Sequence, residues 1–130
     1  MKLTNGEIFN AQEPLKKLLA EKLPVKDSFK LARLAQKLDD QLLAINQTRQ
    51  GLFKTYGDLD TAQQKYIVKP YIDDGSGKAI ENPNVVKFQE EMRELMAIEM
   101  EIVFDKVNLP NTLEIEPRDL IVLEKFVKSN

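Results

Sequence analysis

The chain has 130 residues, of which 31% are charged and 42% hydrophobic, and its net charge is −2. This balance is typical of a soluble globular protein, and the length predicts a single domain over residues 1–130. The absence of cysteine and histidine excludes disulfides, thiolate metal sites and Ser-His-Asp triads and disfavours zinc.

The first residues predict a helix over about residues 4–21. Thr4 and Glu7 have the spacing of a capping box, in which each side chain accepts a hydrogen bond from the backbone N–H of the other residue. Leu3 and Ile8 occupy the two positions of a hydrophobic staple, which would fix the direction in which the chain enters the helix.

Two prolines modify this first helix. Pro14 lies inside it, removes one backbone hydrogen bond and clashes with the preceding turn, so we expect a kink or a break near residues 10–11. Pro24 keeps Leu23 out of the α region and therefore ends the helix.

A longer helix is predicted over about residues 26–56. Its inward residues follow a 4,3,4,3 spacing over nearly four heptads, which is the pattern of a coiled-coil seam and permits a homodimer as well as packing within one chain. Gly57 fits a left-handed residue just beyond the helix end. The seam consists of Leu31, Ala35, Leu38, Leu42, Ile45, Arg49, Leu52 and Tyr56.

Arg49 is the charged residue on this seam. It could fix register or partner choice, as buried polar residues do in coiled coils. Alternatively, its aliphatic stem packs while its guanidinium reaches water, which is the interpretation we favour.

The sequence Gly-Ser-Gly-Lys at residues 75–78 is similar to the end of a phosphate-binding loop. Such a loop needs an earlier glycine where Ile72 stands and a hydroxyl where Ala79 stands. It also needs a helix at once, whereas Pro83 starts the next helix later. The alternative, a turn between two strands, is favoured.

We therefore expect a β-hairpin over about residues 66–81. Residues 66–72 are rich in strand formers, residues 73–77 in turn formers, and residues 78–81 can return as a second strand. Pro70 cannot donate a ladder hydrogen bond, so it favours an edge position.

Asn82 and Pro83 suit a helix start, and a second apolar seam predicts a helix over residues 83–97. Because both helices carry apolar seams, we expect this helix to pair antiparallel with residues 26–56. The second seam consists of Val85, Phe88, Met92 and Leu95.

Residues 98–106 alternate apolar and mostly acidic side chains, which favours a half-buried strand over about residues 99–106. Continuation of the preceding helix is the rival interpretation. Pro117 opens a final helix over about residues 117–128, with Asp119 near its positive end.

Acidic residues suggest two metal sites, and neither is favoured. The Asp/Gly-rich turn lacks the calcium-loop pattern at Asp58, Asp60 and Asp73. A second cluster could serve a Mg²⁺ or Mn²⁺ hydrolase only if carboxylates from other elements converged on it, so we interpret it as a solvated acidic face. That cluster comprises Glu90, Glu91, Glu94, Glu99, Glu101 and Asp105.

The charge is unevenly placed along the chain. Residues 1–56 hold ten Lys/Arg and six Asp/Glu, whereas residues 57–130 hold nine and fifteen. A basic nucleic-acid face and mutual neutralisation of the two halves are the alternatives. Because the lysines are spread out among acidic residues, we favour neutralisation and expect no nucleic-acid binding.

Several short sequence motifs across the chain resemble those of one protein family. They are LTNGE, then KLPVKDSFKLARLAQKL, a long helix ending in YGD, F-x-x-E-M-x-E-L-M running into E-M-E-I, and L-x-I-E-P-R-D-L-I-V-L-E-K-F-V. Together they resemble a family of small proteins of unknown function from tailed bacteriophages and prophages of Gram-positive bacteria. Glu116 stands where that family usually has serine. The resemblance implies a role in the phage particle or its assembly and supplies no catalytic residues.

These observations predict a mostly helical α+β fold. It consists of an antiparallel long-helix pair, a kinked N-terminal helix, a C-terminal helix and a small antiparallel sheet. We expect a non-enzymatic phage protein without cofactor or metal, acting by contact with phage structural proteins in the tail or head region. The alternative is a small regulatory binder of a host or phage enzyme or of nucleic acid.

Two further expectations concern the location of the protein and the residues that contact a partner. No apolar run approaches the ~20 residues of a membrane span or the length of a signal peptide, so we expect synthesis inside the cell without export. Together with this expectation, the resemblance to phage proteins implies location in the host cytoplasm during infection or in the virion. The residues expected to touch a partner are Arg49, Tyr66, Pro70 and Tyr71.

Overall fold

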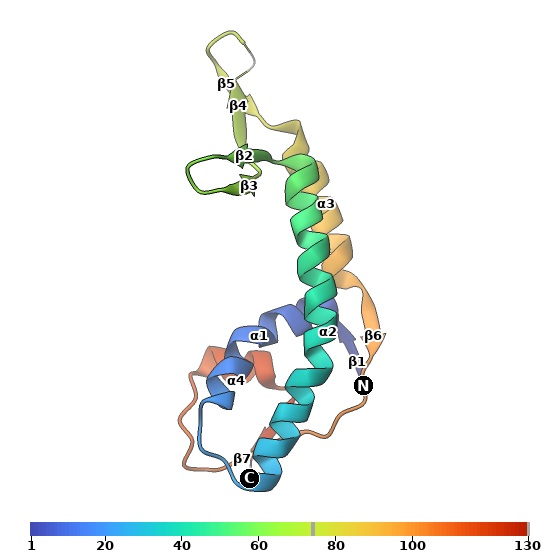
Figure 1. The fold of residues 1–130 in the computed structure, drawn as a ribbon, viewed down its shortest axis with the longest axis vertical. Helices are drawn as coiled ribbons and strands as arrows, with labels where there is room; N and C mark the ends of the chain where they lie inside the picture. The colour runs from blue at the N-terminus through green and yellow to red at the C-terminus, as the bar shows by residue number, and fades with distance from the viewer. Residues whose placement is uncertain (74, 130) are drawn as a thin grey trace. The chain divides into compact units, whose positions relative to one another are not determined.

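The computed structural model describes residues 1–73 and 75–129, which form a mostly helical α+β fold, as the sequence predicts (Figure 1). None of the described helices combines the length and apolarity that a membrane span requires. The elements are β1 (Lys2–Thr4), α1 (Asn5–Leu19), α2 (Val25–Tyr56), β2 (Asp58–Asp60), β3 (Lys65–Ile67), β4 (Tyr71–Asp73), β5 (Ala79–Glu81), α3 (Pro83–Ala97), β6 (Glu99–Glu101), β7 (Val107–Leu109), α4 (Pro117–Leu123) and β8 (Val127–Ser129).

The chain divides into two compact units. Unit 1 comprises Met1–Leu43 and Ile98–Asn130, and unit 2 comprises Ala44–Ala97. Helix α2 therefore contributes its first part to unit 1 and its last part to unit 2. This division does not test the prediction of one domain over residues 1–130, which stays a prediction.

The start of α1 in unit 1 confirms the capping box. Thr4 Oγ1 accepts a hydrogen bond from the Glu7 backbone N–H at 3.1 Å, and Glu7 Oε1 accepts one from the Thr4 N–H at 3.0 Å. Leu3 and Ile8 are fully buried on either side of this cap. Glu7 also forms an ion pair with Lys125.

Helix α1 continues through Pro14 without interruption, so the break expected near residues 10–11 is wrong, and a kink stays a prediction. The carbonyl that loses its partner belongs to Asn10, an exposed residue that water can solvate. Helices α1 and α4 pack side by side (Figure 1). The Lys17 amine joins them through the Asp119 carboxylate at 3.0 Å.

The alternation predicted over residues 98–106 is confirmed only in part as a strand. Residues Glu99–Glu101 form β6, which pairs antiparallel with β1. Ile102 is buried and Phe104 stacks on Phe126 with ring centroids 5.6 Å apart, but residues 102–106 belong to no strand. Side-chain burial continues the alternation after backbone pairing has ended, because the partner strand β1 is only three residues long.

The final helix ends at Leu123, so the predicted helix over residues 117–128 is too long. The N–H of Phe126 bonds to the Leu123 carbonyl at 2.8 Å, a tight final turn, and Val127 then pairs in parallel with Val107. The parallel sheet β7–β8 is an addition that the sequence did not predict. Pairing with a strand about twenty residues earlier overrides local helix propensity here.

Helix α4 begins directly after Glu116. This residue occupies the N-cap but makes no side-chain capping bond, and its carboxylate instead binds Arg118 at 3.0 Å.

Unit 1 contains most of the buried core. On α2 the buried residue is Leu34, whereas Ala35 is only half-buried, so the strict heptad seam is wrong at this turn. A globular core needs a wider apolar stripe than a two-helix seam does. The buried apolar residues of unit 1 are Leu3, Ile8, Ala11, Leu15, Leu18, Leu31, Leu34, Leu38, Leu42, Ile102, Val107, Leu109, Leu123, Phe126 and Val127.

Unit 2 is built on the end of α2 and on α3, which pair antiparallel as predicted (Figure 1). The side-chain amide of Asn84, in the first turn of α3, donates to the carbonyl of Tyr56, the last residue of α2, at 3.3 Å. A hydrogen bond with the Glu91 carboxylate raises the pKa of Tyr56 and adds a further link. Phe53 and Phe88 join the two helices by a tilted ring contact of 4.9 Å.

The predicted hairpin over residues 66–81 is confirmed for the strands at residues 71–73 and 79–81, whereas the first part of its first strand belongs to a second hairpin. Strand β3 pairs with β2, which the sequence did not predict, and β4 pairs with β5. Pro70 lies in neither strand, which corrects its expected edge-strand position. A proline without an N–H divides the stretch into two strands, each with its own partner.

Unit 1 generates a pH prediction. Hydrogen bonding to Lys125 lowers the pKa of Glu7 below its ordinary value of 4.5. A carboxylate with a lowered folded-state pKa contributes stability above its unfolded pKa and loses it as the pH falls through the folded pKa. Wild type should therefore be more stable than Glu7→Gln at pH 7, and this difference should shrink as the pH falls below the ordinary pKa of 4.5 and disappear once the pH is below the lowered folded-state pKa.

Urea unfolding followed by circular dichroism at several pH values measures this difference. Glutamine retains the capping geometry, so the variant isolates the charge. Glu13→Gln is the matched control, because Glu13 and Lys16 form an exposed ion pair of 3.6 Å, which contributes little to stability. A difference between wild type and Glu7→Gln that does not change with pH would contradict the prediction.

Candidate protein-binding groove

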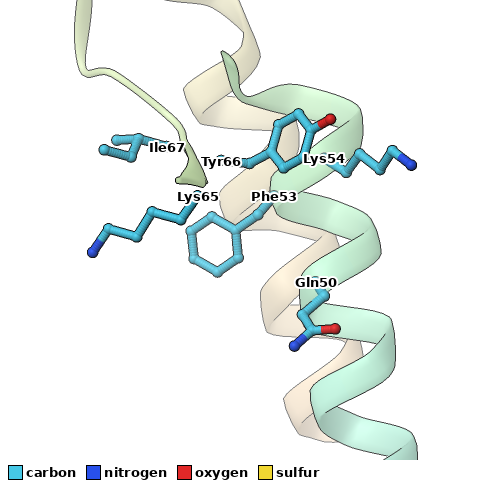
Figure 2. Close-up of a pocket in the computed structure, with 6 residues that line it drawn as sticks. All are labelled: Gln50, Phe53, Lys54, Lys65, Tyr66 and Ile67. Atoms are coloured by element: carbon cyan, nitrogen blue, oxygen red, sulfur yellow. The ribbon is translucent and has the colours of Figure 1, made fainter. Parts of the chain in front are cut away.

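Unit 2 carries an open groove of about 620 Å³ between the last turns of α2 and strand β3 (Figure 2). In Figure 2 the rings of Phe53 and Tyr66 lie between the two elements, and the amines of Lys54 and Lys65 point to opposite sides. The lining residues are Gln50, Phe53, Lys54, Lys65, Tyr66 and Ile67.

Gly57 sets the approach of β3 to the helix. A Cβ at this position would lie 2.5 Å from the Phe53 carbonyl oxygen and 2.7 Å from the Ile67 carbonyl oxygen. Both neighbours are backbone atoms, so no side chain could simply turn aside. Gly57 does not adopt positive φ, which corrects the expected left-handed cap; its role is close backbone approach.

Phe53 forms the apolar floor of the groove. Its ring packs on Phe88 of α3, which holds it in place from the far side. The guanidinium carbon of Arg49 lies 5.9 Å from the centroid of the Phe53 ring, within cation–π range. The floor therefore combines a fixed aromatic surface with a nearby positive charge.

Two lysines flank this floor. Lys54 on α2 and Lys65 on β3 are exposed, and neither amine forms an ion pair with any residue in the described ranges 1–73 and 75–129. Positive charge without an intramolecular partner, beside exposed aromatic surface, suits an incoming carboxylate with an apolar neighbour.

The structure brings two of the four predicted contact residues to the groove. Tyr66 lines it with 37% of its surface exposed, and Arg49 adjoins it through Phe53. Arg49 Nη1 also donates to Asn46 Oδ1 at 3.3 Å, so its half-buried side chain makes contacts on its own helix. Tyr71 is 60% exposed on β4 and does not line the groove.

Pro70, the fourth predicted residue, is held by Asn82. The Asn82 backbone N–H donates to the Pro70 carbonyl at 3.0 Å, and its side-chain amide donates to the Lys69 carbonyl at 2.9 Å. Asn82 Oδ1 accepts from the Asn84 N–H at 3.0 Å, which caps α3. One buried asparagine thus fixes the segment that follows β3.

The Gly-Ser-Gly-Lys sequence forms the β4–β5 turn. Gly75 and Gly77 adopt φ of 92° and 84°, and both donate backbone N–H bonds to Asp73 Oδ1, at 2.9 and 3.2 Å. A strand follows, whereas a phosphate loop needs a helix. Among the described residues no group of three or more acidic side chains could hold a metal ion.

Comparison with protein-family models, with curated proteins and with solved structures finds no match to this chain. The resemblance to phage proteins therefore stays a prediction, and the groove is interpreted from its own residues.

The sequence did not predict most of the lining. Phe53 stands beside the seam residue Leu52, Lys65 lies just before the expected hairpin, and Ile67 lies at its start. The available signal was Gly57, because a glycine directly after a helix can mark close backbone approach as well as a cap. Only the pairing of β3 with β2 places the strand against the helix.

Gly51 inside α2 and Gly57 directly after it give opposite predictions. Gly57→Ala should destabilise unit 2 by about 1–3 kcal/mol, because its Cβ would force backbone to move. Gly51 lies inside the helix with open space where a Cβ would be, so Gly51→Ala should stabilise by about 0.5–1 kcal/mol.

Tyrosine fluorescence during urea unfolding reports unit 2 specifically, because all three tyrosines lie within residues 44–97. Each glycine variant serves as the control for the other. Equal stability of the two variants would contradict the close approach at Gly57.

Asn82→Ala should destabilise unit 2 by about 1–3 kcal/mol, because it removes the helix cap and leaves the Lys69 carbonyl without its donor. Asn82→Ser retains a capping oxygen but cannot replace the amide, so it should recover about 1 kcal/mol. The same fluorescence experiment measures both. If serine recovers nothing, the cap contributes no stability.

Proposed function

We propose that this chain is a non-enzymatic protein of a tailed phage that acts by binding another protein, as a structural or assembly-accessory component of the tail or head region. The observation that carries the proposal is the groove. It presents the aromatic surface of Phe53 and Tyr66 between two lysines that form no ion pair with residues 1–73 or 75–129. The sequence resemblance to phage proteins supplies the biological setting.

The groove fits an extended protein segment. Aromatic side chains supply large apolar contact at low entropic cost, and tyrosine is enriched among residues that dominate binding energy. An apolar side chain would contact Phe53 and Tyr66, and acidic side chains on either side would reach Lys54 and Lys65. The expected partner segment is therefore apolar at its centre and acidic at its flanks.

The neighbouring strand can enlarge this contact. Leu59 stands opposite Tyr66 in the β2–β3 ladder and is 55% exposed. Stable interfaces bury roughly 1,000 Å² or more, which a single groove does not supply. Contact with β2 in addition to the groove would bring the area closer to that range.

Charge reversal in the groove tests the proposal. Tagged protein expressed during infection is treated with an amine-reactive cross-linker, and its partners are identified by mass spectrometry together with the proteins of purified virions. We expect a phage structural or assembly protein cross-linked at Lys54 or Lys65. Lys54→Glu/Lys65→Glu should reduce its recovery by about tenfold, because like charges would face the acidic flanks.

Lys69→Glu/Lys78→Glu is the matched control. It changes the net charge equally on exposed residues of unit 2 that do not line the groove, so recovery should stay at the wild-type level. Equal recovery by wild type and the groove variant would refute the groove as the binding site. If the lost partner is a host or phage enzyme, the regulatory alternative replaces the structural role.

A further inference from the structure

A row of cations lies on one face of α2 within unit 1. Lys26, Lys30, Arg33 and Lys37 follow spacings of 4, 3 and 4, which places their side chains one above another over about 16 Å of helix. We call these four residues the α2 cationic face.

Intramolecular ion pairs do not explain this face. Within the described part of the chain, Lys26, Lys30 and Arg33 form no ion pair, and the Lys37 amine donates to the Val103 carbonyl. Asp105 lines the adjacent pocket without pairing with any of them. Like charges at these spacings and cations near a helix start both destabilise a helix, so local stability does not account for the pattern.

Exposed apolar surface adjoins the cations. A pocket of about 350 Å³ lies between α2 and residues 104–105, and its lining includes Phe29, Leu34 and Phe104 together with three of the cations. Phe29 is 64% exposed, and Val103 is 76% exposed. The surface is therefore amphipathic, with an apolar pocket bordered by positive charge.

We propose that the α2 cationic face and its pocket bind an acidic amphipathic helix of a protein partner. Carboxylates at the same 4,3,4 spacing on that helix would lie opposite the cations, and a large apolar side chain between them would contact Phe29 and Phe104. The positive end of the α2 dipole adds to the attraction for carboxylates.

A protein helix fits this surface better than a nucleic acid does. Exposed aromatic and basic residues alone would suit stacked bases and phosphates. Here the exposed aliphatic Val103, and Val25 one turn before Phe29 at 85% exposure, offer contact to apolar side chains and nothing to phosphates. This site lies in unit 1 and does not depend on the groove function.

The test uses two fluorescent helical peptides of about five turns and of identical composition. One carries glutamates at the 4,3,4 spacing with leucines beside them, and the other distributes the same glutamates around the helix. In anisotropy titrations the wild-type protein should bind the first peptide about tenfold more tightly than the second. Binding should weaken as salt rises, because the contacts are exposed charges.

Two charge-reversed variants complete the design. Lys30→Glu/Arg33→Glu should lose at least about tenfold in affinity for the first peptide. Lys69→Glu/Lys78→Glu changes the net charge equally on exposed residues of unit 2 that line neither the groove nor this pocket, so it should bind this peptide as wild type does. Circular dichroism and urea unfolding establish that both variants fold.

Three outcomes would overturn the proposal. The first is no saturable binding of either peptide up to about 1 mM, and the second is equal affinity for both. The third is tighter binding of a thymidine oligonucleotide than of the peptide at the same salt, lost in Lys30→Glu/Arg33→Glu. That result would assign the face to single-stranded nucleic acid.

Discussion

The site in unit 2 depends on one close backbone contact, between Gly57 and the Ile67 carbonyl. A Cβ on residue 57 would lie 2.7 Å from the Ile67 carbonyl oxygen, so a side chain there would overlap the Ile67 backbone. The contact places β3 against the end of α2, and the strand then supplies half of the groove lining. Without it, the Phe53 ring would keep its contact with Phe88 but would not face β3, and Lys65 would not lie across the groove from Lys54.

Charge in this protein is partly used for structure and partly left for solvent or partners. One ion pair of the kind that neutralisation of the two halves requires joins Lys17 with Asp119, and the neutralisation as a whole stays a prediction. Among the described residues, Lys30 and Arg33 of unit 1 form no ion pair, and neither do Lys54 and Lys65 of unit 2. A net charge of −2 therefore conceals two local positive surfaces, each beside exposed aromatic side chains.

The helices were the most predictable part of the fold, because their signals are local. The capping box at Thr4 and the Asn82-Pro83 start of α3 were confirmed at the residues that carry them. The three-residue strands were not predictable. Strand β2 has no distinctive sequence pattern of its own. Val127 fits the apolar face of the predicted helix, but in the structure it pairs with Val107 of β7.

The sequence alone determined where helices begin, which faces are apolar, and which catalytic groups are absent, since capping, periodicity and composition are properties of neighbouring residues. The tertiary structure decided strand pairing, the division of residues 66–81 between two hairpins, and the gathering of Phe53, Lys54, Lys65 and Tyr66 into one groove. These depend on contacts between segments, and the free energy of such a contact is set by both partners, which no local pattern specifies.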